Sequence, residues 1–113
     1  MENTELRDKC IKAAHKYLNI QSWEKLGDID GFLVYEDSDG YIVFVNVCYS
    51  CEAFKLSDIN TLRACAEDAM YNWFVNDPDT LVDVPVRVDE LSFRILDQGR
   101  ALIKHIYNAV NSL

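Results

Sequence analysis

Apolar positions in the N-terminal segment recur at steps of three and four residues. Lysines fall between them, which is typical of an amphipathic helix with one buried face. Thr4, or Asn3 one residue earlier, is a suitable N-cap. We therefore expect a first helix from Thr4 to Leu18, with Leu6, Cys10, Ala13, Ala14, Tyr17 and Leu18 on its apolar face.

Strand-like segments follow. Residues 21–26 are predicted to form a short strand, and Gly27 a tight turn before the apolar run 32–35. The sequence Asp-Ser-Asp-Gly at 37–40 separates that run from the β-rich run 41–47, which predicts an antiparallel hairpin. The second strand of this hairpin is apolar on both faces, so we expect it at the centre of its sheet.

A second helical pattern begins after Ser57 or Asp58, and either residue can cap it. Residues 76–79, which include Pro78, are expected to end this helix. Residues 84–95 alternate in polarity, which predicts one bent strand or two shorter ones, with Pro85 at a strand start or edge. From Gly99 onward the apolar spacing is helical and predicts a C-terminal helix. The sequence thus indicates an α/β fold with a mixed central sheet flanked by helices.

Length and charge narrow the class of protein. The 113 residues are expected to form one domain, 1–113. The net charge of −8 argues against attraction to a phosphate backbone, so DNA binding is not expected. The sequence has no apolar run long enough to cross a membrane and no N-terminal signal pattern, so we expect a cytoplasmic protein with reduced cysteines.

Two further features suggest chemistry or partners. Cys48 and Cys51 form a CxxC motif, but structural zinc needs a second such pair, so unpaired thiols are expected. Trp and Tyr are favoured at interfaces, which leaves open an acidic protein-binding module that forms a homodimer or binds another protein, although most of these rings are expected in the core. The rings in question are Trp23, Tyr41, Tyr49, Tyr71, Trp73 and Phe74.

Short motifs in three parts of the chain, near its start, around the hairpin and toward its end, match one family in order. Residues 11–18 are similar to Glu-x-x-Ala-x-x-Tyr-Leu, with Ile11 at the first position. Residues 27–30 and 43–48 are similar to Gly-Glu-Ile-Asp and Val-Phe-Val-Glu-Val-Lys. Residues 86–89 and 105–110 are similar to Val-Arg-Phe-Asp and His-Ile-x-Asn-Ala-Phe. The chain thereby resembles the YraN-type family of small bacterial proteins, predicted endonucleases related to archaeal Holliday junction resolvases.

The resemblance implies a restriction-endonuclease-like core in the order helix, strand, hairpin, helix, strand. In such nucleases carboxylates converge on divalent ions and a nearby lysine assists. Carried over, Asp30 is the remaining catalytic residue and a candidate metal ligand, with Asp28 as a second candidate; both aspartates also suit a plain turn after Gly27. At the other family positions, the glutamates are replaced by Ile11 and Asn46 and the lysine by Cys48, whose neutral thiol cannot replace an ammonium group.

Besides the acidic protein-binding module, two functions stay open on the sequence. The first is a catalytically degenerate member of the family, inactive and without a cofactor, retained for binding an unknown protein partner. The second is a metal-dependent endonuclease acting on branched or single-stranded DNA with Mg²⁺ or Mn²⁺, using Asp30 with Asp28 and Glu52. The two differ in whether these three carboxylates converge on a metal-sized site.

Overall fold

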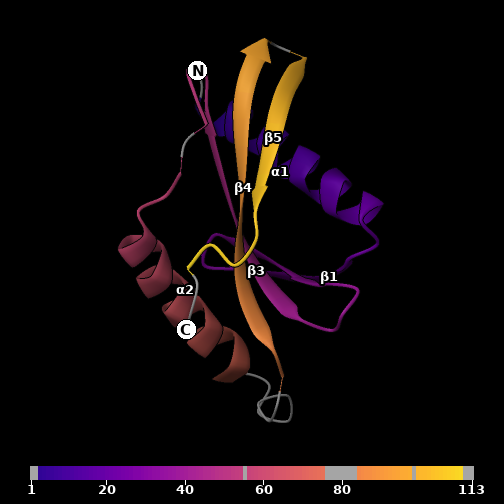
Figure 1. Cartoon of the computed structure of the whole chain (residues 1–113), viewed down its shortest axis with the longest axis vertical. Helices are drawn as coiled ribbons and strands as arrows, with labels where there is room; N and C mark the ends of the chain where they lie inside the picture. Colours follow the sequence, from indigo (N-terminus) through magenta and orange to yellow (C-terminus); the bar gives the residue numbers. More distant parts are fainter. Residues whose placement is uncertain (1–2, 55, 76–83, 98, 111–113) are drawn as a thin grey trace.

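The computed structural model describes residues 3–54, 56–75, 84–97 and 99–110. These residues form a five-stranded mixed sheet with one helix on each face (Figure 1). Strand order is β1-β2-β3-β4-β5; β3 and β4 run parallel and the other neighbours antiparallel. The elements are α1 (Asn3–Ile20), β1 (Glu24–Ile29), β2 (Phe32–Glu36), β3 (Ile42–Ser50), α2 (Ile59–Val75), β4 (Val86–Asp97) and β5 (Arg100–Ile106).

Two apolar clusters, one on each face of the sheet, hold the helices in place. On one face Ala14 and Leu18 of α1 are fully buried in a cluster that includes Val43 of β3. On the other face Ala66 of α2 lies in a cluster with Phe44. Successive residues of a strand point to opposite faces, so the doubly apolar β3 serves both clusters. Burial of a valine, leucine or phenylalanine side chain stabilises the folded state by roughly 1.5–3 kcal/mol relative to an exposed one.

Both predicted helices before residue 76 are confirmed. The first extends over Asn3–Ile20, and the second begins at Ile59 directly after Asp58. Asp58 is the N-cap, because its Oδ2 accepts a hydrogen bond of 3.0 Å from the backbone N–H of Thr61. That hydrogen bond holds the pKa of Asp58 below its usual value. The predicted stop at residues 76–79 lies outside the described residues.

The predicted hairpin is confirmed as β2 and β3. Asp37 organises its turn: Oδ1 accepts hydrogen bonds from the backbone N–H groups of Asp39, at 2.9 Å, and Tyr41, at 3.0 Å. Gly40 has a φ of 89°, which favours glycine. The strand β3 lies third of five, so its expected central position is also confirmed.

The expected turn at Gly27 is wrong. Gly27 lies within β1, at an irregularity in its pairing with β2, and the turn falls instead at Asp30 and Gly31, with φ values of 51° and 87°. Gly27 has a different use, since a Cβ there would lie 3.2 Å from the Trp73 ring of α2. The glycine thus allows the helix to approach the sheet.

Of the two alternatives left open for residues 84–95, the single strand is correct. Val86–Asp97 is one strand, and Asp89 and Glu90 lie within it. Pro85 precedes it, as expected, and its carbonyl accepts a 2.9 Å hydrogen bond from the N–H of Ile42.

The predicted C-terminal helix is wrong. Arg100–Ile106 forms β5, an edge strand antiparallel to β4, and residues 107–110 form a turn. The apolar positions of a short segment can fit both the helical and the strand spacing. Here the segment forms a strand because β4 supplies its backbone hydrogen-bond partners in an antiparallel hairpin. The chain then returns to the α2 face, where Val110 is fully buried.

Neither described helix is both long and apolar enough to cross a membrane.

Candidate functional site

Asn46 and Cys48 of β3, the positions at which the resemblance expects Glu and Lys, lie beside a buried carboxyl group of β4. Asn46 Nδ2 donates to Glu90 Oε1 at 3.2 Å, and Cys48 Sγ donates to Glu90 Oε2 at 3.4 Å. The parallel register pairs Asn46 with Glu90, and residues two apart on β3 point to one face, so both side chains reach the same carboxyl group. This face is the one covered by α2.

The residues just before α2 complete this cluster. The backbone N–H of Ser57 donates to Glu90 Oε2 at 3.0 Å, and Asn46 Nδ2 also contacts Ser57 Oγ at 3.1 Å. Glu90 is only 2% exposed. Its two oxygens are therefore engaged by an amide, a thiol and a backbone N–H. Donors from the protein itself thus satisfy the hydrogen bonding of this carboxyl group, as is usual for buried polar groups.

Asp30 lies at a different place. It occupies the turn between β1 and β2, as the plain turn interpretation expected, and its Oδ2 accepts a 2.9 Å hydrogen bond from Asn72 Nδ2 of α2. Asp30 and Asn72 line an open pocket of about 360 Å³ together with Asp68, Cys65 and Tyr71. The strand residue Asp28 pairs with Leu33 in β1–β2.

The remaining predicted positions are spread further. Ile11 packs against the apolar cluster under α1, on the opposite sheet face from Asn46. Glu52 follows β3 and is exposed, with its backbone N–H bonded to Ser50 Oγ at 3.1 Å. Within the described ranges, no three or more His, Cys, Asp or Glu side chains are grouped so that they could hold a metal ion. Asp28, Asp30 and Glu52 therefore form no such group.

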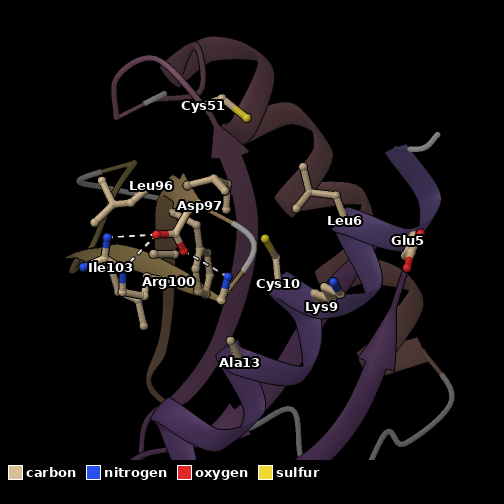
Figure 2. Close-up of a pocket in the computed structure, with 14 residues that line it drawn as sticks. Glu5, Leu6, Lys9, Cys10, Ala13, Cys51, Leu96, Asp97, Arg100 and Ile103 are labelled. Atoms are coloured by element: carbon tan, nitrogen blue, oxygen red, sulfur yellow. Dashed lines mark hydrogen bonds and ion pairs between the residues drawn. The ribbon is translucent and has the colours of Figure 1, made fainter.

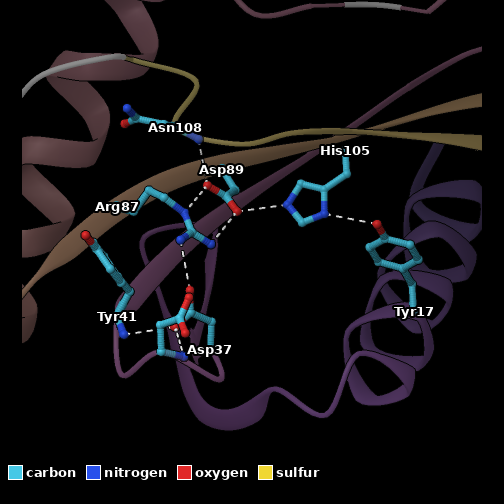
Figure 3. A network of polar contacts seen from close by, with 8 residues as sticks. Tyr17, Asp37, Tyr41, Arg87, Asp89, His105 and Asn108 are labelled. Carbon is cyan, nitrogen blue, oxygen red and sulfur yellow. Dashed lines mark hydrogen bonds and ion pairs between the residues drawn. The ribbon is translucent and has the colours of Figure 1, made fainter.

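A second polar network lies on the α1 face (Figure 3). Asp89 is fully buried, and both of its oxygens accept hydrogen bonds from Arg87, at 2.8 and 3.0 Å. Arg87 also contacts Asp37 at 2.8 Å, which ties β4 to the β2–β3 turn. The backbone N–H of Asn108 donates to Asp89 Oδ1 at 2.9 Å.

His105 links this network to α1. Its Nε2 lies 2.8 Å from Asp89 Oδ2, and its Nδ1 lies 3.0 Å from the hydroxyl of Tyr17. An ionised Asp89 needs a donor, so the arrangement assigns the ring hydrogen to Nε2 and leaves Nδ1 to accept from Tyr17. Burial alone would raise the pKa of Asp89, but the hydrogen bonds from His105, Arg87 and Asn108 outweigh it and hold that pKa below its usual value.

Arg87 is enclosed by aromatic rings as well as carboxylates. Its guanidinium carbon lies 5.5 Å from the centroid of Trp23, 5.4 Å from Tyr41 and 5.6 Å from Tyr107. Each distance is within the range of a cation–π contact. Burial would lower the pKa of Arg87, but the Asp89 and Asp37 carboxylates raise it.

Sequence reasoning missed Glu90 and the partners of Arg87. In the sequence, the pair Asp89-Glu90 resembles a polar break between two strands. Only a strand that runs without a break through residues 86–95 would place the two side chains on opposite faces of the sheet, each of them buried. None of the four cysteines, all of which lie in the described residues, forms a disulfide, and the Cys48 thiol donates to Glu90. Of the larger aromatics, Trp23 is buried, Trp73 and Phe74 pack against the α2 cluster, and Tyr71 is 70% exposed.

Comparison with protein-family models and with curated proteins finds no match to this chain.

Proposed function

We propose that this protein is a YraN-type nuclease-fold domain that has lost its catalytic chemistry and works by binding another protein. The element order α1, β1, β2–β3, α2, β4 is the order that the resemblance implies. Two groups of residues support this proposal.

The main support is the network around Asp89, because it joins residues from separate parts of the resemblance. Tyr17 comes from the first stretch, Arg87 and Asp89 from the fourth strand, and His105 and Asn108 from the tail. These stretches are far apart in sequence, and the matched residues contact one another through hydrogen bonds. If these positions have been retained because they hold the fold together, the matched residues should contact one another in one buried network, as they do here.

The second support is the substitution of the positions that would do chemistry. Metal-dependent cleavage needs carboxylates with free oxygens and a positive charge near the leaving group. At the two β3 positions this chain has an amide and a thiol, and both donate to Glu90. Those donors and Ser57 occupy the oxygens of the nearest buried carboxyl group. Asp30 is the one carboxylate that matches at a catalytic position of the resemblance, and Asn72 donates to it.

DNA cleavage tests this proposal directly. Purified protein would be incubated with supercoiled and branched DNA in Mg²⁺ or Mn²⁺, beside an Asp30→Ala variant and a matched Asp68→Ala variant from the same pocket. We expect no metal-dependent cutting by any of the three proteins. Cutting by the natural sequence that is lost in Asp30→Ala and kept in Asp68→Ala would refute the proposal and identify Asp30 as a ligand.

A positive control comes from restoring the family residues. A double variant carrying Asn46→Glu and Cys48→Lys provides two of the missing charged groups on one face of β3, beside Glu90; Ile11 is left unchanged because it packs in the apolar cluster on the opposite sheet face. Titration calorimetry with Mn²⁺ would compare it with the natural sequence. We expect measurable Mn²⁺ binding in the double variant alone; equal binding by the unaltered chain would favour the endonuclease alternative, in which Asp30 acts with Asp28 and Glu52.

A further inference from the structure

Strand β5 forms one edge of the sheet, and its outer side is open. It is last in the strand order, and among the described residues it pairs with β4 alone (Figure 1). The helix α1 packs on β3 and β1, and its hydrogen bond to β5, between Tyr17 and His105, falls near the end of that strand. Residues 100–104 are all exposed, although their side chains alternate between the two faces. This edge of the sheet is therefore uncovered over residues 100–104.

The opposite edge of the sheet, β1, is less regular. Its pairing with β2 has an irregularity between Lys25 and Gly27. Such an irregularity twists an edge strand and weakens its capacity to accept another strand. The register of β5 with β4 is continuous over residues 101–106, and its one shift lies at the hairpin tip. A regular edge with unpaired backbone N–H and C=O groups is a surface to which an extended segment can add as a further strand.

The side chains of β5 place positive charge on one face. Ile106 lies opposite Glu90, whose side chain is on the α2 face, and directly opposite residues share a face. In steps of two residues, Lys104, Leu102 and Arg100 also point to the α2 face. Along this face the strand is therefore basic, apolar and basic. The strand contains no Asp or Glu, although the whole chain has a net charge of −8.

Neighbouring side chains add to this positive charge. Arg94 of β4 is exposed on the same face, beside the middle of the row. Lys104 Nζ lies 6.0 Å from the centroid of the Phe54 ring, a cation–π distance that keeps the ammonium group on this face. At the hairpin tip Asp97 is ion-paired with Arg100 at 2.8 Å and offsets one of the three charges (Figure 2). Arg94 and Lys104 leave this face of the hairpin positive.

The register defines the segment that would fit this edge. The side chains of an added strand lie directly opposite those of β5 and interact with them in pairs. Two acidic residues four positions apart would face Arg100 and Lys104, and an apolar residue midway between them would face Leu102. On the other face, an apolar residue would contact Ile103, which is 38% exposed. Charge and spacing thus both favour an acidic segment with apolar residues at its centre.

The same charges discriminate against other strands. Basic side chains on an edge strand generally keep further strands away. A second β5 that paired with its faces matched would bring both copies of Arg100 and Lys104 onto one face, and like charges oppose such a contact. An acidic segment is the kind of strand for which this barrier becomes an attraction.

We propose that β5 accepts an extended acidic segment of a partner protein as a further strand of the sheet, with two carboxylates on Arg100 and Lys104 and an apolar residue on Leu102. This inference rests on the proposed binding function and names its surface and the chemistry of its partner. Because it concerns binding and not cleavage, its failure would leave the expected absence of nuclease activity untouched.

Two synthetic peptides of about nine residues, within the usual length of a strand, provide the probe. They share a valine-rich sequence and carry either glutamate or lysine at two positions four residues apart. Fluorescence anisotropy with the full chain should give at least about tenfold tighter binding of the glutamate peptide, and added salt should weaken it. Equal binding of both peptides, or no binding of either, would overturn the proposal.

Hydrogen exchange of the backbone amides tests whether the peptide binds as a strand. Every second residue of β5 directs its N–H away from β4. In the free chain these outward amides should exchange rapidly, and saturating glutamate peptide should slow them at least about tenfold, as read by nuclear magnetic resonance. The outward amides of β1, at residues 24–29, are the control and should not change. Unchanged exchange in β5, or equal slowing in β1, would contradict strand addition at this edge.

A charge-reversed variant locates the acidic side chains of the peptide. Lys104→Glu should weaken binding of the glutamate peptide at least about tenfold and strengthen binding of the lysine peptide. Lys12→Glu makes the same change of net charge at an exposed position of α1 and should leave both affinities unchanged. Circular dichroism would check that both variants fold. Equal effects of the two substitutions would show that net charge and not β5 governs binding.

Two further outcomes would assign the edge to another occupant and overturn the proposal. The first is a dimer of the natural chain, seen by analytical ultracentrifugation, that the glutamate peptide dissociates; it would assign β5 to a second copy. The second is displacement of the glutamate peptide by a single-stranded oligonucleotide, which would assign the basic face of the hairpin to nucleic acid.

Discussion

Asp89 and Glu90 are neighbours on one strand, yet they occupy contrasting environments. Asp89 points to the α1 face, where an arginine and a histidine contact its oxygens. Glu90 points to the α2 face, where its contacts are the amide of Asn46, the thiol of Cys48 and the backbone of Ser57. Both side chains are almost completely buried, at 0% and 2% exposed.

The contrast separates two uses of a buried carboxyl group. A buried ion pair is costly to break, because removal of one partner leaves the other charge unpaired. Asp89 therefore fixes the mutual positions of α1, β4, β5 and the β2–β3 turn. Glu90 instead accepts hydrogen bonds from donors that carry no charge, among them Asn46 and Cys48. We infer that the first region specifies the fold; under the proposed function, the second is the place where charged catalytic groups have been replaced.

The largest expected effect comes from Asp89→Asn. The substitution keeps the size of the side chain but leaves the Arg87 guanidinium facing an amide, so we expect the free energy of unfolding to fall by about 3–5 kcal/mol. Urea denaturation followed by circular dichroism would measure it. Asp97→Asn breaks an exposed pair with Arg100 and should cause no measurable change. Equal losses in the two variants would remove the basis of the comparison.

Glu90→Gln should have a smaller effect. One oxygen is replaced by an NH₂ group that faces donors, so one hydrogen bond is lost and the expected decrease is about 1–2 kcal/mol. The same denaturation experiment gives the value. If Glu90→Gln proved as destabilising as Asp89→Asn, Glu90 would need a charged partner, and the distinction between the two regions would be wrong.

The pH dependence of stability sharpens the comparison further. The pKa of Asp89 is lower in the folded protein than its ordinary value of 3.8, so its contribution is complete above that value. As the pH falls through the lower folded value, the contribution is lost with a slope of up to about 1.4 kcal/mol per pH unit. Urea titrations from pH 5 downward, at about half-unit steps, should show this acid loss in the natural sequence and in Glu90→Gln, and a shallower loss in Asp89→Asn. Parallel curves for all three proteins would contradict the assignment.

Tyr17→Phe should produce the smallest change. It removes one hydroxyl donor to His105 and leaves the ring packing intact, so we expect a decrease of about 0.5–1.5 kcal/mol. Tyr71→Phe, at a tyrosine that is 70% exposed, should leave the melting temperature unchanged and is the control. A larger loss for Tyr71 than for Tyr17 would show that the hydroxyl of Tyr17 does not support the network.

The sequence predicted the elements whose periodicity is strong and local. The first two helices, the Asp37–Gly40 hairpin and the central place of β3 follow from caps, turn residues and apolar spacing within short windows. The segment after Gly99 was misassigned because its apolar positions fit a helix, and its strand pairing depends on β4. The turn near Gly27 was misplaced because a glycine can serve a turn or a close helix approach, and the Trp73 ring that distinguishes them comes from α2.

For the candidate site, the sequence by itself determined which residue types stand where the resemblance expects catalytic groups: Asp30 present, and Ile11, Asn46 and Cys48 in place of charged residues. Only the tertiary structure decided what those residues contact. Glu90 and Arg87 acquire their partners across 44 and 50 positions of sequence, from Asn46 and Asp37. Strand pairing and burial create such contacts, and a pattern confined to a few neighbouring residues contains no information about them.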